Sequence, residues 1–570
     1  MKHTLLILGI LLICSWTSNG QNSTLLFNDY EGNVNSEQQN IIDNNLALPS
    51  VKQNNTIVID QSILENPTLE LRLFDNQILR FEEFDIGHSG INYRYWTGQN
   101  AAGDAAFLIN GDRISGHISG AFGNYEIYPL GNGVHLFAEL DNEQFDGCGN
   151  ENEEQIFTPK DNKQGTEKSV VGTECFIRLI VGYTSLAKSR TASNFGRTMN
   201  EHIGLAVIES NQGYANSDVE LRVELAFSYE TDDNETFFSG TDVNALQSQT
   251  DGKWDEIHGF RDDYDGDMVA LVTGGQHILV CGQAFGFDYT DDANMFQVSE
   301  YNCIVGNYTF AHEFGHNQGC RHDNDGTQTP FTYARGYNDG AERTIMAVSS
   351  TPPRRNHWSN PDINFPSGNV TGTADRDNAR ALDFGDATVA SHRVTPMDYA
   401  VDVVVEEDQT INMVTTNLLT STSDVEAGAI LELKSQGSVT LQAGFHAKPG
   451  SEMRAYVIPL CTASYSLQDE EKVEGRTAQV ITLDKNDLQI APNPTYGNIQ
   501  LTWTQQTDKE INIELKDAYG RSVMTLLTHT WYSAGEHQLE INTSHLASGL
   551  YYLVLNVEEQ ATVKSVVILN

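Results

Sequence analysis

Short runs in which apolar and polar residues alternate recur along the chain and predict strands, because successive side chains of a strand point to opposite faces of a sheet. In the first part of the chain these runs occupy residues 69–74, 78–84, 92–98, 106–112 and 125–130. The run at 175–183 predicts a further strand, and the mostly apolar run at 267–273 suits a buried central strand. Apolar residues at helical spacing predict a helix across 195–210.

The first residues have the composition of an export signal. Lys2 and His3 precede an apolar run that is shorter than the roughly 20 residues needed to cross a bilayer, and small residues precede Gln21. This order predicts a secretory signal peptide at 1–20, with a lipid anchor on Cys14 as the alternative. No later run is long and apolar enough for a transmembrane helix, so we expect none in the mature chain.

Changes of pattern divide the rest of the chain into blocks. Residues 21–168 are strand-rich and end in a polar stretch from Asp141 that is typical of a linker, whereas residues 169–396 mix strands and helices. Residues 399–461 and 488–570 are two all-β modules, and residues 462–487 are the polar linker between them. The predicted fold class is a multidomain α+β protein, with one α/β domain preceded by a β-rich block and followed by two all-β modules.

Charge and cysteine content narrow the class of protein. The 570 residues include 34 Lys and Arg against 78 Asp and Glu, a formal net charge of −44. Such a chain lacks the basic surface that nucleic-acid binding requires, so no nucleic-acid partner is expected. Six cysteines follow the signal peptide, too few for a disulfide scaffold, and sequence alone does not choose among their pairings. They are Cys148, Cys175, Cys281, Cys303, Cys320 and Cys461.

One stretch has the spacing of a metal site. His312, Glu313 and His316 form the pattern H-E-x-x-H, which on a helix places both histidines on one face, where they can bind one Zn²⁺. Gly319 can adopt a positive φ and reverse the chain, so that His322 returns as the third ligand. Three protein ligands leave a fourth position open, which is typical of a catalytic zinc. The alternative is three unrelated surface histidines.

This extended motif, with Met346 standing 24 residues after His322, resembles that of the metzincin metalloproteases. The pairs His316-Asn317 and His322-Asp323 are most similar to the reprolysin/adamalysin branch, and Val348 argues against the astacin branch. The block from about 175 to 393 also looks like bacterial secreted relatives of this branch, some of which are peptidyl-Asp metallopeptidases.

The resemblance implies an α/β metzincin domain at 169–396 and a secreted zinc-dependent metalloendopeptidase that hydrolyses proteins or peptides. It implies one catalytic zinc, a zinc-activated water with Glu313 as its general base, and a turn carrying Met346 that packs under the metal. The alternative function is a cell-surface adhesin that uses a protease-like fold only for binding. The intact ligands and base count against that alternative.

The resemblance also implies a substrate-binding rim. A strand at 282–287 would pair with the substrate backbone through Gly282, Gln283, Ala284 and Phe285, unless it is an ordinary edge strand. A Cys281–Cys303 disulfide would tie this strand to the segment that enters the zinc helix. In this family the segment after the methionine turn walls the P1′ pocket, which takes the residue after the scissile bond. There Arg354 or Arg355 would bind an acidic side chain, unless both are a solvated basic pair.

The C-terminal block resembles another known family. Ala491-Pro-Asn-Pro opens it, Leu546-Ala-Ser-Gly-Leu follows, and Lys564-Ser-Val-Val-Ile closes it, as in the C-terminal sorting domain of the type IX secretion system, an immunoglobulin-like β-sandwich. This implies the type IX machinery as a partner, export through the periplasm and outer membrane of a Gram-negative bacterium, and a secreted or cell-surface product. The alternative is a carbohydrate- or matrix-binding β-sandwich.

A protease made inside a cell must stay inactive until export, and residues 21–168 lie where this family has its propeptide, so we expect a zymogen. Cys148 stands in a polar, glycine-flanked stretch, and its thiolate would occupy the open zinc position. This resembles a cysteine switch, although the flanking arginine and proline of that motif are missing. The alternatives are a disulfide, for example with Cys175, and an inert thiol. Cleavage between Lys160 and Lys168 would release the block.

Calcium is a second candidate cofactor. Aspartates cluster at 262–267, 288–292 and 323–326, and carboxylates on loops suit Ca²⁺. None of these stretches matches an EF-hand loop, and in so acidic a chain such clusters also arise by chance.

Overall fold

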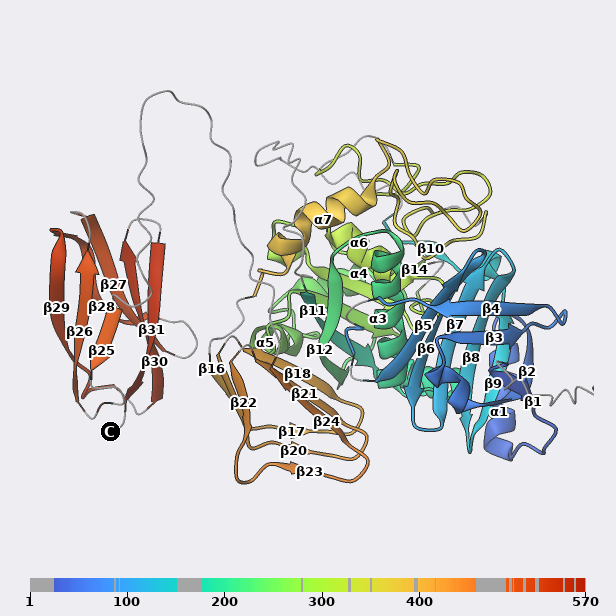
Figure 1. Cartoon of the computed structure of the whole chain (residues 1–570), viewed down its shortest axis with the longest axis horizontal. Coiled ribbons are helices and arrows are strands. Elements are labelled where there is room, and N and C mark those ends of the chain that lie inside the picture. Colours follow the sequence, from blue (N-terminus) through green and yellow to red (C-terminus); the bar gives the residue numbers. More distant parts are fainter. Residues whose placement is uncertain are drawn as a thin grey trace, which may run out of the picture. The chain divides into compact units, whose positions relative to one another are not determined.

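Figure 1 shows the computed structural model of the chain, which describes residues 25–150, 176–457 and 488–568 except for short gaps. The gaps are 87–88, 92, 278–279, 326–329, 349–350, 394–397, 416, 436, 492–494, 496, 506–508, 518–521, 547–548 and 558–559. The signal peptide predicted at 1–20, the processing region predicted at 160–168 and the linker predicted at 462–487 lie outside the described residues. The chain divides into two compact units, Met1–Ser464 and Tyr465–Asn570.

The N-terminal block is built around one antiparallel sheet, with strand order β1-β2-β9-β8-β7-β6-β5-β4-β3. Its elements are β1 (Phe27–Asp29), α1 (Ser36–Leu46), β2 (Val51–Ile59), η1 (Gln61–Glu65), β3 (Thr68–Arg72), β4 (Ile78–Glu83), β5 (Arg94–Asn100), β6 (Gly103–Asn110), β7 (Arg113–Gly120), β8 (Gly123–Gly131) and β9 (Val134–Leu140). Side chains alternate between the two faces, and both faces are buried. One face packs Phe107 and Phe137 into a core of its own, and the other packs Leu108 and Leu136 against the next block.

The second block contains a mixed sheet, with strand order β10-β14-β15-β13-β11-β12-β18-β21-β24. The last elements of the N-terminal block, η2 (Asn142–Gln144) and β10 (Gly147–Cys148), precede it, and β10 joins this sheet. The elements of the second block before residue 398 are β11 (Phe176–Thr184), α2 (Ser185–Phe195), α3 (Met199–Asn216), β12 (Arg222–Thr231), α4 (Ser239–Gln247), α5 (Glu256–Asp263), β13 (Met268–Thr273), β14 (Val280–Ala284), η3 (Asp292–Asn294), β15 (Phe296–Glu300), α6 (Thr309–Asn317) and α7 (Asn378–Val389). Strands β11, β12, β13 and β15 run parallel, and β14 is antiparallel to β15. Helix α3 is buried along almost its whole length.

Several predicted elements correspond to observed ones, with shifted ends. The helix expected across 195–210 is α3, which begins at Met199 because Thr198 and Glu201 form a capping box there. The stretch from Asp141 that is typical of a linker is partly regular, since it contains η2 and β10. Pairing with β14 orders these polar residues, and no local pattern in the sequence reveals a pairing partner that, for Gly147 and Val280, is 280 − 147 = 133 positions away.

Buried ion pairs join the N-terminal sheet to the second block. Arg197, which precedes α3, lies 2.8 Å from Glu126 of β8, and Glu209 of α3 lies 2.5 Å from the Nδ1 atom of His117 in β7. All four side chains are almost fully buried. A buried charge is strongly destabilising without its partner, so these pairs hold the sheet in one position against α3.

The module that starts at residue 398 is a stack of parallel coils. Its strands are β16 (Asp398–Val401), β17 (Val404–Val405), β18 (Thr410–Thr415), β19 (Leu418–Ser421), β20 (Asp424–Val425), β21 (Ile430–Ser435), β22 (Ser438–Leu441), β23 (His446–Ala447) and β24 (Glu452–Val457). Asp398 pairs with Leu418, which pairs with Ser438, so one coil takes 20 residues. Ile411 of β18 pairs with Phe227 of β12, and the stack thereby continues the sheet of the second block.

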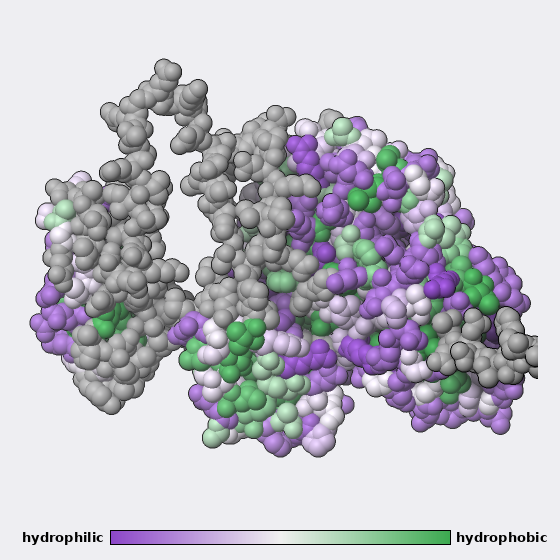
Figure 2. All heavy atoms as spheres, viewed as in Figure 1, coloured by the Kyte–Doolittle hydropathy of each residue, from purple (hydrophilic) through white to green (hydrophobic). Residues whose placement is uncertain are grey.

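The stack leaves apolar side chains exposed. Figure 2 shows apolar surface over this module. Its exposed large hydrophobic residues are Tyr399, Val404, Leu441, Tyr456 and Val457. The last two belong to β24, which is the end strand of its sheet.

The second unit consists of two antiparallel sheets, with strand orders β25-β26-β29 and β28-β27-β30-β31. Its strands are β25 (Leu488–Ala491), β26 (Asn498–Gln505), β27 (Lys509–Asp517), β28 (Ser522–Tyr532), β29 (Gly535–Asn542), β30 (Gly549–Val557) and β31 (Gln560–Ile568). Residues of both sheets, including Trp503 and Leu553, share one core. Among the helices of the described residues, none has the length and apolar character needed to cross a membrane.

Candidate metal centre

Helix α6 carries two histidines. In each, one ring nitrogen contacts a backbone carbonyl and the other faces the candidate metal site. His312 and His316 are one turn apart and buried. Their Nδ1 atoms lie 2.8 Å from the carbonyl oxygen of Ile345 and 2.9 Å from that of Cys320. These carbonyls accept a hydrogen bond from a protonated Nδ1, so each Nε2 keeps its lone pair. Burial lowers the pKa of both imidazoles well below the ordinary value, which favours the neutral form that binds metals.

The chain reverses directly after α6 and brings a third histidine to the same point. Gly319 makes the turn with a φ of 89°, in the region that favours glycine, and a Cβ atom there would lie 2.7 Å from Pro330. The Nε2 atom of His322 consequently lies 3.2 Å from that of His312 and 2.9 Å from that of His316. The backbone N–H of His322 donates to Asp325 at 3.1 Å.

These donors fit a zinc ion. The three imidazole nitrogens and the Sγ atom of Cys148 lie within 4.8 Å of one another and are all buried. Lone pairs facing one another at such distances repel unless a cation lies between them, and nitrogen and sulfur donors in fourfold arrangement are the ligands that Zn²⁺ takes. Among the described residues, no other group of three or more potential metal ligands was found, and the aspartate clusters give calcium no support.

Glu313 lies beside the histidines, and its Oε2 atom is 3.7 Å from the sulfur of Cys148. The side chain is fully buried, and its Oε1 atom has no hydrogen-bond partner among the described residues. Burial raises its pKa to about 8. Strand β14 passes close to it at Gly282, where a Cβ atom would lie 2.8 Å from Cγ of Glu313. Glycine at this position therefore leaves room for the carboxylate.

Met346 packs against α6, the helix that carries His312 and His316. It is fully buried, and the absent Cβ of Gly315 would lie 2.8 Å from its sulfur and 2.7 Å from the ring of Trp358. Glycine between the two histidines of α6 thus permits the methionine turn to approach the helix directly. The carbonyl of the preceding Ile345 orients His312, so this turn also supports the metal site.

Strand β14 forms one rim of the site, and residues of the N-terminal block cover it. The predicted strand 282–287 is observed at Val280–Ala284, so Gly282, Gln283 and Ala284 lie on it and Phe285 follows. On one side β14 pairs with β15, and on the other it pairs in parallel with β10. The side-chain amide of Asn150 adds two hydrogen bonds of 2.9 Å to the backbone of Ala284.

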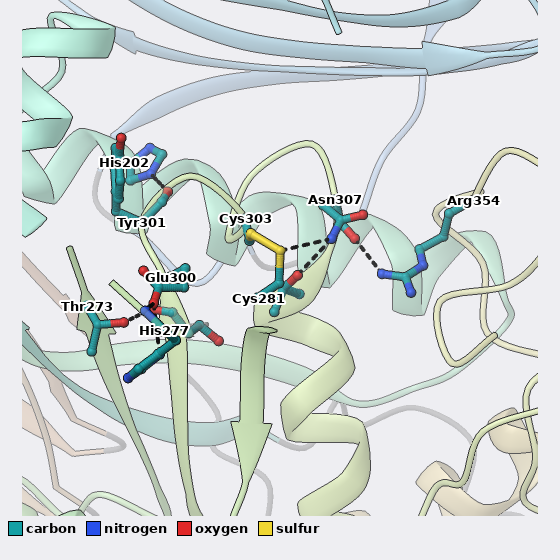
Figure 3. Close-up of a disulfide and its surroundings, with 11 residues drawn as sticks. His202, Thr273, His277, Cys281, Glu300, Tyr301, Cys303, Asn307 and Arg354 are labelled. Carbon is teal, nitrogen blue, oxygen red and sulfur yellow. Dashed lines mark hydrogen bonds and ion pairs between the residues drawn. A yellow bond between two sulfur atoms is a disulfide. The ribbon is translucent and has the colours of Figure 1, made fainter. Parts of the chain in front are cut away.

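A disulfide joins Cys281 of β14 to Cys303, with 5.7 Å between their Cα atoms. Figure 3 shows it between the strand and the segment that leads into α6. The amide nitrogen of Asn307 lies 3.7 Å from the Cys281 sulfur. The rim strand and the entry to the zinc helix are therefore covalently linked.

The thiol of Cys148 is free and buried. Its sulfur lies 3.5 Å from Nε2 of His316 and 3.7 Å from Oε2 of Glu313. Burial, followed by the charge of Glu313, raises its pKa well above the ordinary value. The structure brings this cysteine to the metal site, and it forms no disulfide, although Cys175 lies outside the described residues.

The sequence did not reveal Asn150, Asn307 or Asp325 as parts of the site. Asp325 follows His322 by three residues, and its proximity to a ligand was a usable signal. Asn150 stands two residues after Cys148, but its contact with Ala284, 134 positions along the chain, arises only in the tertiary structure, as do the contacts of Asn307 with Cys281 and Arg354.

A glutamate beside three converging imidazoles, on a helix under a mixed sheet, defines a metal-dependent hydrolase. Residues 177–359 match the model of metallo-peptidase family M12. A peptidyl-Asp metalloendopeptidase of Stenotrophomonas maltophilia is 31% identical over 379 residues, which is 61% of this chain and 88% of the relative. A peptidyl-Asp metalloendopeptidase of Xanthomonas campestris is 33% identical, and the match covers 54% of this chain and 73% of the relative. The chain belongs to metallo-peptidase family M12 and is a zinc metalloendopeptidase.

The C-terminal unit also matches a family. Residues 489–569 match the secretion system C-terminal sorting domain, so the chain carries the sorting domain of type IX secretion. Among solved structures, metalloproteinase-II from Bacteroides fragilis is similar at a TM-score of 0.33 and 10% identity, over 51% of this chain and 86% of that one.

Proposed function

We propose that His312, His316 and His322 hold the zinc ion of this metalloendopeptidase and that Glu313 is its general base. The observation that carries the proposal is the convergence of three buried Nε2 atoms beside the buried carboxylate of Glu313. When bound, zinc supplies a Lewis acid that polarises a peptide carbonyl and a water molecule. Glu313 takes a proton from the attacking water and delivers it to the leaving amine.

The test is Glu313→Gln, which keeps the size of the side chain and removes its ability to accept a proton. We expect kcat to fall by at least roughly 10²-fold, the typical contribution of a general base, while the zinc content per chain stays unchanged. Glu230→Gln is the control, because Glu230 is partly exposed and pairs only with Lys188 of α2. Full activity in the Glu313 variant would exclude this mechanism.

The substrate proposal rests on the relatives and on the rim strand. The matched relatives are named peptidyl-Asp metalloendopeptidases, and we infer that this chain likewise cleaves proteins or peptides next to aspartate. Gly282–Phe285 pair with the substrate backbone, because β14 offers an edge once β10 is removed. Mapping the cut bonds of a peptide library tests this, and cut sites without enrichment of aspartate would contradict it.

Latency follows from the contacts of the N-terminal block. We propose that residues 21–168 are a propeptide, that Cys148 supplies the fourth zinc ligand in the zymogen, and that β10 covers the rim that the substrate would use. Cleavage between Lys160 and Lys168 then frees the site. The free thiol, its 3.5 Å distance from Nε2 of His316 and the paired strands support this. A Cys148→Ser proenzyme as inactive as the wild type would contradict the role of the thiol.

The route of export completes the proposal. The type IX sorting domain implies secretion, and we propose passage through the periplasm and outer membrane of a Gram-negative bacterium, directed first by the signal peptide at 1–20. The mature protease then comprises residues 169–396 with the module at 399–461, and the domain at 488–570, an immunoglobulin-like sandwich, is the export signal. Fractionation of a culture that expresses the gene tests this, since a chain without 488–570 should stay inside the cell.

A further inference from the structure

The geometry points to Arg354 as the residue that selects an acidic side chain at P1′, with Arg343 behind it as a second positive charge. This assignment rests on the proposed function, because it names the group that would read the substrate at the proposed site.

Arg354 lies between the two segments that flank the zinc helix. Its Nη1 atom donates to the carbonyl of Asn307 at 2.8 Å, and its Nη2 atom donates to the carbonyl of Ala347 at 3.0 Å. Asn307 precedes α6 by two residues, and Ala347 follows Met346. Figure 3 shows the guanidinium pointing toward Asn307, next to the disulfide that anchors the rim strand. The side chain is thus fixed beside the reacting groups and stays partly exposed.

Two guanidiniums meet at this point, and the charge of Asp323 acts on both from beyond ion-pair distance. Arg343 donates to the carbonyls of Pro352 and Ala347, so two guanidiniums converge on the same carbonyl oxygen of Ala347. Among the described residues, neither guanidinium has a carboxylate at ion-pair distance, and Nε of Arg354 has no partner. Burial, followed by the charge of Arg354, lowers the pKa of Arg343 to about 8. A carboxylate from outside would complete the pairing.

Arg354 also acts on the groups that take part in the chemistry. The charge of Arg354 acts on both Glu313 and Cys148, which places the guanidinium near these groups. The thiol of Cys148 stands where a substrate approaches the zinc site. A substrate side chain directly next to the scissile bond would therefore meet the same positive field, and a planar guanidinium can bind a carboxylate with two parallel hydrogen bonds.

Arg355 forms an ion pair inside the fold. The structure thereby distinguishes it from Arg354, which the sequence did not. Its Nε atom lies 2.6 Å from Oε1 of Glu342, and both side chains are almost fully buried. This pair satisfies the charge inside the fold. Arg355 therefore supports the segment, whereas Arg354 remains available to a ligand.

The experiment measures kcat/KM of the activated enzyme on peptides that differ only at P1′, which is Asp, Asn or Ala. Wild type should favour Asp over Asn, and Arg354→Met should lose roughly 30-fold or more on the Asp peptide, as expected when one partner of a buried charge pair is removed. The ratio of its kcat/KM on the Asp peptide to that on the Ala peptide should fall as well, which separates loss of the P1′ contact from any general effect on Glu313. Arg355→Gln is the control and should lower thermal stability while the Asp to Asn ratio stays as in wild type.

Two further measurements keep the assignment open to refutation if Arg354→Met is poorly folded. Arg354→Lys keeps one positive charge without the fork, so its Asp to Asn ratio should lie between those of wild type and Arg354→Met. Arg354→Glu should reverse the preference toward a P1′ Lys peptide. If folded, zinc-loaded variants keep the wild-type ratio of kcat/KM on the Asp and Asn peptides, the assignment of Arg354 is wrong. Activity of these variants on the Ala peptide would still support the proposed function. If the activated wild-type enzyme cleaves none of the peptides, the proposed function is refuted instead.

Discussion

The side-chain amide of Asn150 pairs with the backbone of Ala284 as a peptide group would. Its nitrogen donates to the Ala284 carbonyl and its oxygen accepts from the Ala284 N–H, both at 2.9 Å. One residue earlier, the N–H of Gly149 donates to the carbonyl of Gly282 at 2.8 Å. The N-terminal block thus uses backbone and side chain together to occupy the rim strand, in addition to the thiol that faces the zinc site.

Latency should therefore depend on two separable contacts. Cys148→Ser should raise the activity of the uncleaved proenzyme, and adding Asn150→Ala should raise it further by roughly tenfold, because two neutral hydrogen bonds contribute about 0.5–1.5 kcal/mol each. Peptide hydrolysis by uncleaved protein, verified by gel, is the measurement. Asn28→Ala, at an exposed position of β1, is the matched control. A double variant no more active than Cys148→Ser would show that Asn150 adds nothing.

Zinc affinity should depend on Asp325. This carboxylate accepts from the backbone of His322 and lies 3.7 Å from its Nδ1 atom, so it orients the third ligand. We expect Asp325→Ala to weaken zinc binding by roughly 10–100-fold, as is usual when a partner of a ligand is removed. Competition with a chelator of known affinity measures this. Asp375→Ala, whose side chain is 71% exposed, should match wild type, and equal affinity in both variants would contradict the role of Asp325.

Two helical glycines should respond in opposite ways to alanine. At Gly315 of α6, the new Cβ would meet Met346 and Trp358 at under 3 Å, and such overpacking costs about 1–3 kcal/mol. At Gly259 of α5 nothing lies within 4 Å, so alanine should stabilise the helix by roughly 0.5–1 kcal/mol. Denaturant unfolding of the two variants measures the difference. A similar free energy of unfolding for both would contradict the close approach of the methionine turn.

Stability should fall at alkaline pH through His277. Burial lowers the pKa of this imidazole, but its contacts with Asp242 at 3.0 Å and Glu300 at 2.8 Å outweigh burial and raise it from 6.5 to about 9. The folded state therefore binds a proton more tightly than the unfolded chain. The resulting stabilisation is complete below pH 6.5 and is lost as the pH rises through about 9.

Melting temperatures measured from pH 6 to about 10 test this. Wild type should lose more stability across that range than His277→Gln, which has no proton to release. His117, whose pKa is also raised to about 9, is present in both proteins, so the difference between the two curves isolates His277. Parallel curves would contradict the assignment.

The part of the site that spacing along the chain predicts by itself is the three histidines, whereas Cys148, Met346 and the strand at 282–287 were expected only from the resemblance to a known family. His312, His316 and His322 lie within one helix and one turn, so their spacing alone is sufficient to bring them together. Arg354 and Arg355 are adjacent in the chain, yet one faces Asn307 and the other Glu342, and only packing of distant segments decides which. The helices α1, α2 and α5 were not predicted, because each is short and buries only two or three side chains.

The pairing of β12 with β18 also determines where the chain can be shortened. Lys434 of β21 lies 2.7 Å from Glu224 of β12, which also pairs with Arg178 of β11 at 2.6 Å, and all three side chains are buried. A recombinant peptidase that ends near residue 396 would expose the unpaired edge of β12 to solvent, and exposed strand edges promote aggregation. It would also remove Lys434, one of the two cations that pair with Glu224. A shortened form of this enzyme should therefore keep β18 and β21, which cover the edge of β12 and supply Lys434.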